Sequence, residues 1–389
     1  MTPPSSAETV HVSATHSPAP TDPPDLGALL AHAVERGGSD LHLKVPSRPI
    51  VRVNGVLAQV PGYEILRPED TARFAAELLR GNESKRSEFE DCGETDLSHT
   101  REGLGRFRVN IFRQRGSISI VLRVVPFKVL SVEDLDLPPV VGRLADEERG
   151  VILVTGTTGS GKSTTLAAMI DRINRTSHKH VVTIEDPIEM LHIDRGSLIN
   201  QREVGMDTES FQSALRRVLR QDPDVIMIGE IRDLTTMETA LSAAETGHLV
   251  LSTMHTLDAT ETVNRAIGFF PLHQQQQVRA MLAGTLRGII SQRLVRTADG
   301  NGRVPACEVM VSTGRAKDMI LNASETGRLS EVIREGEFYG MQTFDQSLFD
   351  HVTAGRVTLA AAMEAASSPH DFKLMLDAGA SRREAAQYS

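Results

Sequence analysis

Residues 156–163 read Gly-Thr-Thr-Gly-Ser-Gly-Lys-Ser and match the phosphate-binding pattern Gly-x-x-x-x-Gly-Lys-Ser/Thr at every fixed position. The apolar run 151–154 before this loop predicts a buried parallel strand. Apolar residues at helical spacing after it, from Leu166 to Ile173, predict a helix. A strand, a glycine turn and a helix N-terminus direct backbone N–H groups and the positive end of the helix dipole at a phosphate. The stretch therefore predicts a nucleotide-binding α/β domain.

The loop also predicts what it binds. Lys162 is expected to reach the β- and γ-phosphates of ATP, and Ser163 is expected to hold Mg²⁺. The residues expected to contact the nucleotide are Gly156, Thr157, Thr158, Gly159, Ser160, Gly161, Lys162, Ser163 and Thr164. ATP and Mg²⁺ are thus the expected ligands.

A second motif runs from Arg220 to Asp233. Its apolar segment 225–228 predicts a buried strand, and the strand is followed by an acid, Glu230. A carboxylate at the C-terminal edge of an α/β sheet faces the ligand crevice, where it can bind Mg²⁺ through water. The residue before it, usually Asp, is Gly229 here, so Glu230 must carry the metal or water role alone. The alternative is an incidental acid after a core strand.

Two further clusters follow buried strands. The segment 183–189 carries three acids, Glu185, Asp186 and Glu189, of which one could bind metal and another orient the attacking water. A solvated acidic turn is the alternative. The segment 247–255 is a buried strand that ends in Thr253 and His255, which share a face and could sense the γ-phosphate. A purely structural histidine is the alternative there.

Composition limits the range of functions. The formal net charge is −9, and the chain has no Trp and three Tyr, which disfavours a nucleic-acid partner. Two cysteines are too few for a disulfide framework or a four-cysteine zinc site. Because we find neither an 18-residue apolar stretch nor a signal peptide, we expect a cytoplasmic protein that is peripheral to the membrane through its partners.

The chain is long enough for two or three domains. We predict a disordered tail over 1–25, a small α+β domain over 26–125, a linker over 126–139, an ATPase domain over 140–304, a C-terminal helical region over 305–370 and a tail over 371–389. Apolar spacing predicts one long helix through Val278 and Ile289. Thr235 with Glu238, and Thr343 with Gln346, fit helix-starting capping boxes.

Arginines crowd the two late strands predicted in the first domain. Arg108 and Arg123 are candidates for contacts with the nucleotide of a neighbouring subunit, where they would stabilise transition-state charge. A solvated basic face is the alternative reading. Arg123 ends the last strand, just before the predicted linker.

Taken in this order, the motifs resemble the secretion ATPase superfamily of type II secretion and type IV pilus motors. The segments 38–42 and 340–346 also look like its pilus retraction branch, the PilT family. The resemblance implies a RecA-like core, a PAS-like N-terminal domain and a homohexameric ring. It also implies a cytoplasmic motor at the inner-membrane pilus platform protein that depolymerises pilin for twitching motility. By motif position, Glu189 is the catalytic carboxylate and Glu230 its partner.

Two observations bear on the branch of the superfamily to which the chain is assigned. Assembly ATPases carry an extra N-terminal domain and usually a four-cysteine zinc motif, and this chain has neither feature. After Val311 the retraction family's Ala-Ile-Arg-Ala-Gly-Arg-like motif is not recognisable. The second observation also fits a PilU-like accessory motor that works with a paralogous retraction ATPase. An assembly ATPase and a RecA-like nucleic-acid motor are the remaining alternatives.

Overall fold

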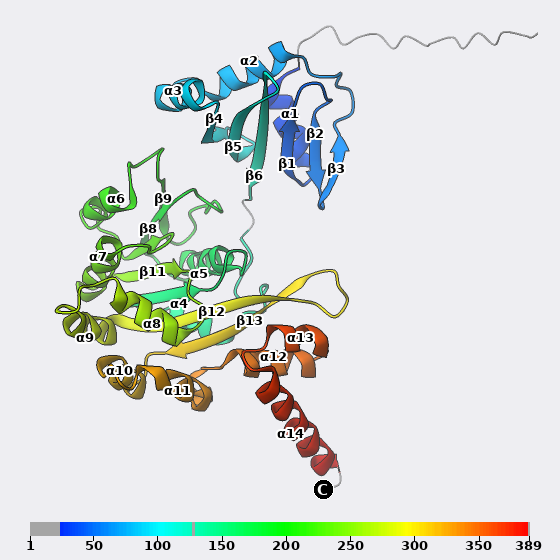
Figure 1. Ribbon diagram of the computed structural model, residues 1–389. Helices are drawn as coiled ribbons and strands as arrows, with labels where there is room; N and C mark the ends of the chain where they lie inside the picture. The colour runs from blue at the N-terminus through cyan, green and yellow to red at the C-terminus, as the bar shows by residue number, and fades with distance from the viewer. Residues whose placement is uncertain (1–23, 127–128, 388–389) are drawn as a thin grey trace, which may run out of the picture. The chain divides into compact units, whose positions relative to one another are not determined.

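The computed structural model describes residues 24–126 and 129–387 and divides the chain into two compact units, Met1–Val124 and Val125–Ser389. The predicted disordered tail over 1–25 lies almost wholly outside the described residues. No helix in the described ranges has both the length and the apolar character needed to cross a membrane. Figure 1 shows the elements of each unit.

Within its described residues, the first unit contains a six-stranded sheet in the order β3-β2-β1-β6-β5-β4. Its strands are β1 (Gly38–Leu43), β2 (Ile50–Val53), β3 (Val56–Gln59), β4 (Glu94–Arg101), β5 (Gly105–Gln114) and β6 (Ser117–Val125), and its helices are α1 (Leu26–Glu35), α2 (Pro68–Leu78) and α3 (Glu83–Cys92). Strand β5 buries every second residue, Phe107, Val109 and Ile111 among them, so one face of the sheet covers the core. The predicted α+β fold of this region is present.

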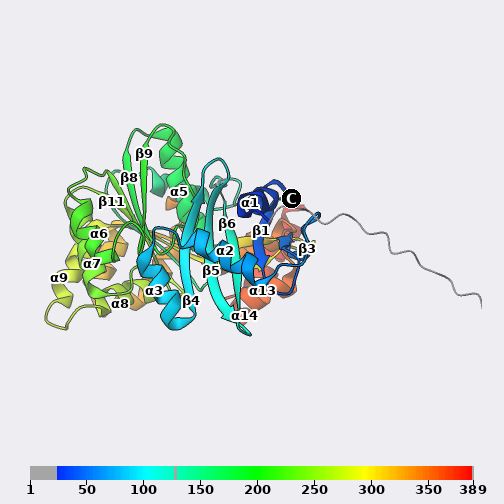
Figure 2. The ribbon, with the colours of Figure 1, turned by 90° about the horizontal axis from the view of Figure 1, so that it is seen from above.

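The sheet of the second unit has seven strands among the described residues, in the order β13-β12-β7-β11-β10-β8-β9. The strands are β7 (Gly150–Thr155), β8 (His180–Glu185), β9 (Leu198–Glu203), β10 (Val225–Ile228), β11 (Leu249–Met254), β12 (Leu286–Arg296) and β13 (Arg303–Val311). All of them run parallel except β13, which pairs antiparallel with β12. Strands β7, β10 and β11 are buried at every residue, as expected for central strands covered on both faces. Figure 2 shows β8 and β9 at one edge of this sheet.

Helices pack on this sheet and extend beyond it. They are α4 (Pro139–Ala145), α5 (Lys162–Thr176), α6 (Phe211–Val218), α7 (Leu234–Glu245), α8 (Ala259–Gly268), α9 (Gln275–Thr285), α10 (Gly314–Leu321), α11 (Leu329–Glu335), α12 (Phe344–Thr353), α13 (Leu359–Ala365) and α14 (Pro369–Gln387), with short 3₁₀ turns η1 (Thr326–Arg328) and η2 (Glu337–Tyr339). The alternation of strands and helices confirms the α/β class predicted from the sequence.

Several local predictions need correction. The long helix predicted through Val278 and Ile289 ends at Thr285, because the following residues pair with β7 and β13 as strand β12. The predicted boundary between 304 and 305 falls inside β13. The capping box at Thr235 is wrong, because the N-cap is Asp233, whose side chain accepts from the backbone N–H of Thr236.

Two segments have more structure than a linker and a tail imply. In the predicted linker, Val132 and Leu137 are buried in the core of the second unit, so this segment packs on the ATPase domain. Helix α14 covers most of the region predicted as a tail over 371–389. The capping box at Thr343 and Gln346 is present at the start of α12, as predicted.

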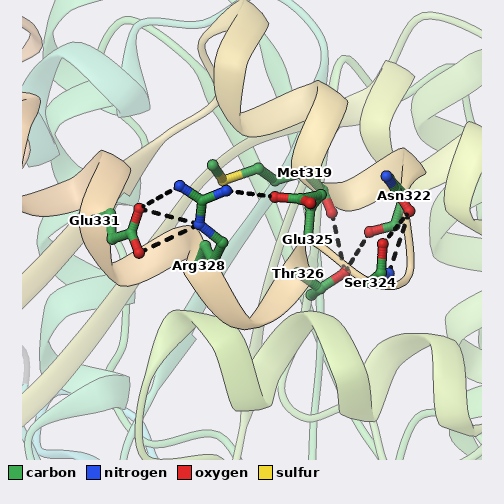
Figure 3. Close-up of polar contacts among 7 residues, drawn as sticks. All are labelled: Met319, Asn322, Ser324, Glu325, Thr326, Arg328 and Glu331. Carbon is green, nitrogen blue, oxygen red and sulfur yellow. Dashed lines mark hydrogen bonds and ion pairs between the residues drawn. The ribbon is translucent and has the colours of Figure 1, made fainter.

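The segment between α10 and α11 is fixed by its own polar contacts, which Figure 3 shows. The Thr326 hydroxyl donates to the carbonyl oxygen of Met319 at 3.0 Å, and the Arg328 guanidinium pairs with Glu325 and Glu331. Buried Arg279 of α9 donates to the Thr326 hydroxyl at 3.0 Å. This stretch, which follows the position of the unrecognised motif after Val311, is therefore an ordered part of the fold.

Candidate active site

Four strands of the second unit end at one edge of its sheet. Because β7, β8, β10 and β11 are parallel neighbours or near neighbours, the segments that follow them meet there. They border a cavity of about 560 Å³. Among the residues that line it are Thr158, Gly159, Gly161, Lys162, Ser163, Thr164, Glu185, Asp186, Glu189, His192, Phe211, Glu230, Arg232, Thr253, His255, Leu294 and Arg303. The structure therefore brings the phosphate loop, the acidic segment, Glu230 and His255 into one site.

The phosphate loop connects β7 to the N-terminus of α5. Gly156 has a φ of 139°, and a Cβ there would lie 2.5 Å from the carbonyl oxygen of Gln292, so only glycine fits. The Lys162 ammonium donates to the carbonyl oxygens of Gly156 at 2.8 Å and Thr157 at 3.0 Å. Burial lowers the pKa of Lys162, while the Glu230 carboxylate acts in the opposite direction. The loop therefore wraps around the ammonium group of Lys162 at the start of helix α5.

Glu230 is held by partners on both of its oxygens. Its Oε2 lies 2.7 Å from Nη2 of Arg232, and its Oε1 lies 3.2 Å from Nε2 of His255. The Thr253 hydroxyl donates to the carbonyl oxygen of Gly229 at 2.7 Å and so ties the ends of β11 and β10 together. The carboxylate is consequently fixed at the cavity wall.

The three acids at the end of β8 and in the segment after it differ in exposure and in contacts. Glu185 is buried; its Oε1 accepts from the Thr183 hydroxyl at 2.7 Å, and its Oε2 accepts from the backbone N–H of Glu189 at 3.3 Å. Burial raises the pKa of Glu185. Asp186 and Glu189 are exposed and line the cavity. Both oxygens of Glu185 therefore bind the chain around it, including the backbone of Glu189, whereas the Glu189 side chain is accessible to a water molecule.

Several predicted contact residues do not line this cavity. Gly156, Thr157 and Ser160 belong to the loop but are not among the residues that line the cavity. Arg108 lies half-buried on β5 of the first unit. Arg123 lies two residues before the end of β6, where its Nε donates to Oδ1 of Asp40 at 2.8 Å while 64% of its side chain stays exposed.

Sequence reasoning missed other residues of the site. Arg232 lies within the motif that was recognised, yet its pairing with Glu230 was not predicted. His192, Phe211, Leu294 and Arg303 reach the cavity from segments without a recognised motif. Burial lowers the pKa of His192 to about 4, so its imidazole is neutral at pH 7. No local pattern marks these positions, because chain topology alone brings them to the cavity.

The site suits a nucleotide with Mg²⁺. The exposed Ser163 hydroxyl stands at the N-terminus of α5, and Glu230 faces the same cavity. Mg²⁺ prefers oxygen ligands and usually keeps several waters beside substrate phosphates. A hydroxyl and a carboxylate beside a phosphate loop provide such ligands.

The fold and this site define the class of the protein. The chain belongs to the family described as type II/IV secretion system protein, whose sequence profile matches residues 23–336. The resemblance to the secretion ATPases inferred from the sequence is thereby confirmed.

Individual relatives narrow the comparison. The chain is 42% identical over 348 residues to "Type IV pilus retractation ATPase PilT" of Pseudomonas aeruginosa, a match that covers 90% of this chain and 100% of that protein. It is also 42% identical to "Type IV pilus ATPase PilU" of the same organism, over 90% of this chain and 91% of that protein. A crystal structure of the pilus retraction motor PilT with bound ADP is similar to this structure, with a TM-score of 0.80, 44% identity, and coverage of 89% of this chain and 98% of that one. These matches confirm the predicted fold class.

Proposed function

We propose that this chain is an ATP-hydrolysing motor that assembles as a homohexamer and powers type IV pilus retraction. The observation that carries the proposal is the meeting of Lys162, Glu189, Glu230 and His255 around one cavity of about 560 Å³. The similarity to named retraction ATPases over nine-tenths of the chain supports it.

Each residue has a proposed part in hydrolysis. Lys162 neutralises charge on the β- and γ-phosphates, and the backbone N–H groups of the loop orient them. Glu189 accepts the proton of the attacking water as general base. Glu230 orients that water or the ligands around it, and His255 fixes Glu230. Mg²⁺, held by Ser163 and through water by Glu230, would offset the developing negative charge.

The cellular setting follows from the same family. We place the motor at the cytoplasmic face of the inner membrane, where the ring would act on the pilus platform protein. Its link to the membrane would be through partners, and nucleic acid would have no part in its cycle. Hydrolysis would supply the work that depolymerises pilin.

A steady-state ATPase assay with the purified chain tests the enzymatic part. Lys162→Ala should lose nucleotide binding or turnover, because the main cation facing the phosphates is removed. Glu189→Gln should retain ATP but hydrolyse it at least about 10²-fold more slowly, the lower scale for loss of a positioned general base. Wild-type turnover in Glu189→Gln would refute the base assignment. Stimulation of ATPase by DNA would favour a nucleic-acid motor instead.

A second candidate is an accessory retraction ATPase that acts with a paralogous motor. Equal identity to PilT and PilU, 42% in both cases, favours keeping it. Expression of this chain in a piliated strain that lacks its retraction ATPases separates the two candidates. A self-sufficient motor restores twitching alone, whereas an accessory motor restores it only when the paralogue is also supplied.

A further inference from the structure

The segment that carries Glu189 is held from one side by strand β9. The β8–β9 register pairs Thr183 with Gln201 and Glu185 with Glu203. Because paired residues of neighbouring strands point to the same face, these four polar side chains lie together on one face of the sheet, at its β9 edge.

Gln201 makes two bonds to the backbone of this segment. Its Nε2 donates to the carbonyl oxygen of Met190 at 2.8 Å, and its Oε1 accepts from the N–H of His192 at 2.8 Å. Its Nε2 also lies 3.1 Å from Oε1 of Glu185. One amide therefore supplies both the donor and the acceptor that the irregular backbone lacks, a pattern that an aliphatic or acidic side chain cannot reproduce.

Glu203 and Glu185 hold the preceding residues. Oε2 of Glu203 accepts from the N–H of Ile188 at 3.0 Å, and Glu203 is 3% exposed. Oε2 of Glu185 accepts from the N–H of Glu189 itself. Side chains of β8 and β9 thus bind the backbone at positions 188, 189, 190 and 192, on both sides of the exposed carboxylate.

We propose that Gln201 and Glu203 are positioning residues that fix the Glu189 carboxylate for attack of water on the γ-phosphate. The proposal rests on the proposed function, in which Glu189 is the general base. Glu189 lies in no helix or strand, so these bonds help to fix the backbone from which its side chain extends. A shift of about 1 Å in a reacting group can lower a rate about 10²-fold.

The central variant is Gln201→Glu, which keeps the side-chain shape but replaces the amide donor by an acceptor. It removes donation to Met190 and Glu185 and adds negative charge beside Glu185. Asn200→Asp is the matched control, since it makes the same chemical change on the neighbouring residue of β9, whose amide contacts half-buried His180 instead. Glu203→Ala and Glu203→Gln form a second pair, because the amide of Gln can still accept from Ile188.

Two measurements are made on each variant. In ATP hydrolysis, Gln201→Glu and Glu203→Ala should lower kcat between about 10-fold and about 10²-fold. Their KM should change little, and Asn200→Asp and Glu203→Gln should stay near wild type. Hydrogen–deuterium exchange of the peptide covering 186–192 should be faster in Gln201→Glu and Glu203→Ala alone.

A double variant decides whether the effect passes through Glu189. In the Glu189→Gln background, Gln201→Glu should lower kcat no further. An equal loss in both backgrounds, a wild-type kcat in Gln201→Glu, or unchanged exchange would each overturn the positioning role. Failure of the proposed function has a separate signature: the wild-type protein would not hydrolyse ATP, while the exchange data would still report whether the bonds hold the segment.

Discussion

The Nε2 atom of His255 lies 3.2 Å from Oε1 of Glu230. The two residues follow neighbouring parallel strands, β11 and β10, and Arg232 occupies the other oxygen of Glu230 at 2.7 Å. Each oxygen of the carboxylate therefore has one partner. The arrangement sets the direction of Glu230 before any nucleotide binds.

This relationship predicts a shared effect of His255 and Arg232. His255→Ala and Arg232→Ala should each lower kcat by about 10-fold or more, because Glu230 loses one of its two orienting partners. Their effects should be strongly non-additive, with an interaction energy of about 0.5–3 kcal/mol in a double-variant cycle of kcat values. In a Glu230→Ala background neither change should matter. Additive losses in that background would show that His255 and Arg232 act elsewhere.

The buried carboxylate of Glu308 is not among the groups that line the cavity. Oε1 of Glu308, on β13, accepts from the N–H of Ala259 at the start of α8 at 2.9 Å. Burial raises the pKa of Glu308 from 4.5 to about 7, with Asp258 and Asp345 acting in the same direction and Arg293 in the opposite one. Between these two values the native state binds more protons than the unfolded state, so the free energy of unfolding falls as the pH rises through this window.

Glu308→Gln should therefore gain stability relative to the wild-type protein as the pH rises from 5 to 8. The amide can still accept from Ala259 but carries no charge that burial disfavours. The gain should be about 1–3 kcal/mol, and thermal unfolding of both proteins across the pH range measures it. Glu238→Gln, at an exposed position on α7, is the control and should show no such trend. A difference between Glu308→Gln and wild type that does not vary with pH would contradict the prediction.

The apolar pattern within a segment predicted the helices and strands that this pattern alone determines. Strand β10 has the predicted bounds, 225–228, because it is an uninterrupted apolar run. Leu286 and Ile289 continue the helical spacing of the preceding residues, yet they belong to strand β12, and only its pairing with β7 and β13 reveals this. Sequence reasoning failed where the competing structures differ in tertiary contacts alone.

The same distinction applies to the site. Motifs located the loop around Lys162, the acid Glu230 and the strand end at His255, since each combines a strand with a chemically specific residue. The bonds from Gln201 and Glu203 were not predicted, because they depend on the register between β8 and β9. Contacts set by register leave no signature within a single segment.

The last prediction is about Arg123 in the proposed hexameric ring. The Nε atom of Arg123 is bound by Asp40, which is buried, while 64% of the Arg123 side chain remains exposed. Although burial alone raises the pKa of Asp40, the hydrogen bonds from Arg123 and Ser39 bring it below its ordinary value. Asp40 is therefore ionised at pH 7 and binds the Nε atom of Arg123. The exposed part of the Arg123 side chain can then contact an anion. We propose that this anion is the nucleotide of a neighbouring subunit.

An arginine acting in trans contributes its charge only when subunits assemble. Arg123→Ala should therefore spare ATP binding by an isolated subunit and lower turnover in the hexamer by about 10³-fold or more, the scale for an arginine finger. The decisive experiment mixes Arg123→Ala subunits, intact at Lys162, with Lys162→Ala subunits, intact at Arg123. Neither parent should hydrolyse ATP, but a mixed ring contains sites that pair an intact Lys162 with a neighbour's intact Arg123. Activity recovered on mixing supports the shared site. If native mass spectrometry shows mixed rings and no activity returns, Arg123 does not act in trans, and Arg108 becomes the residue to test.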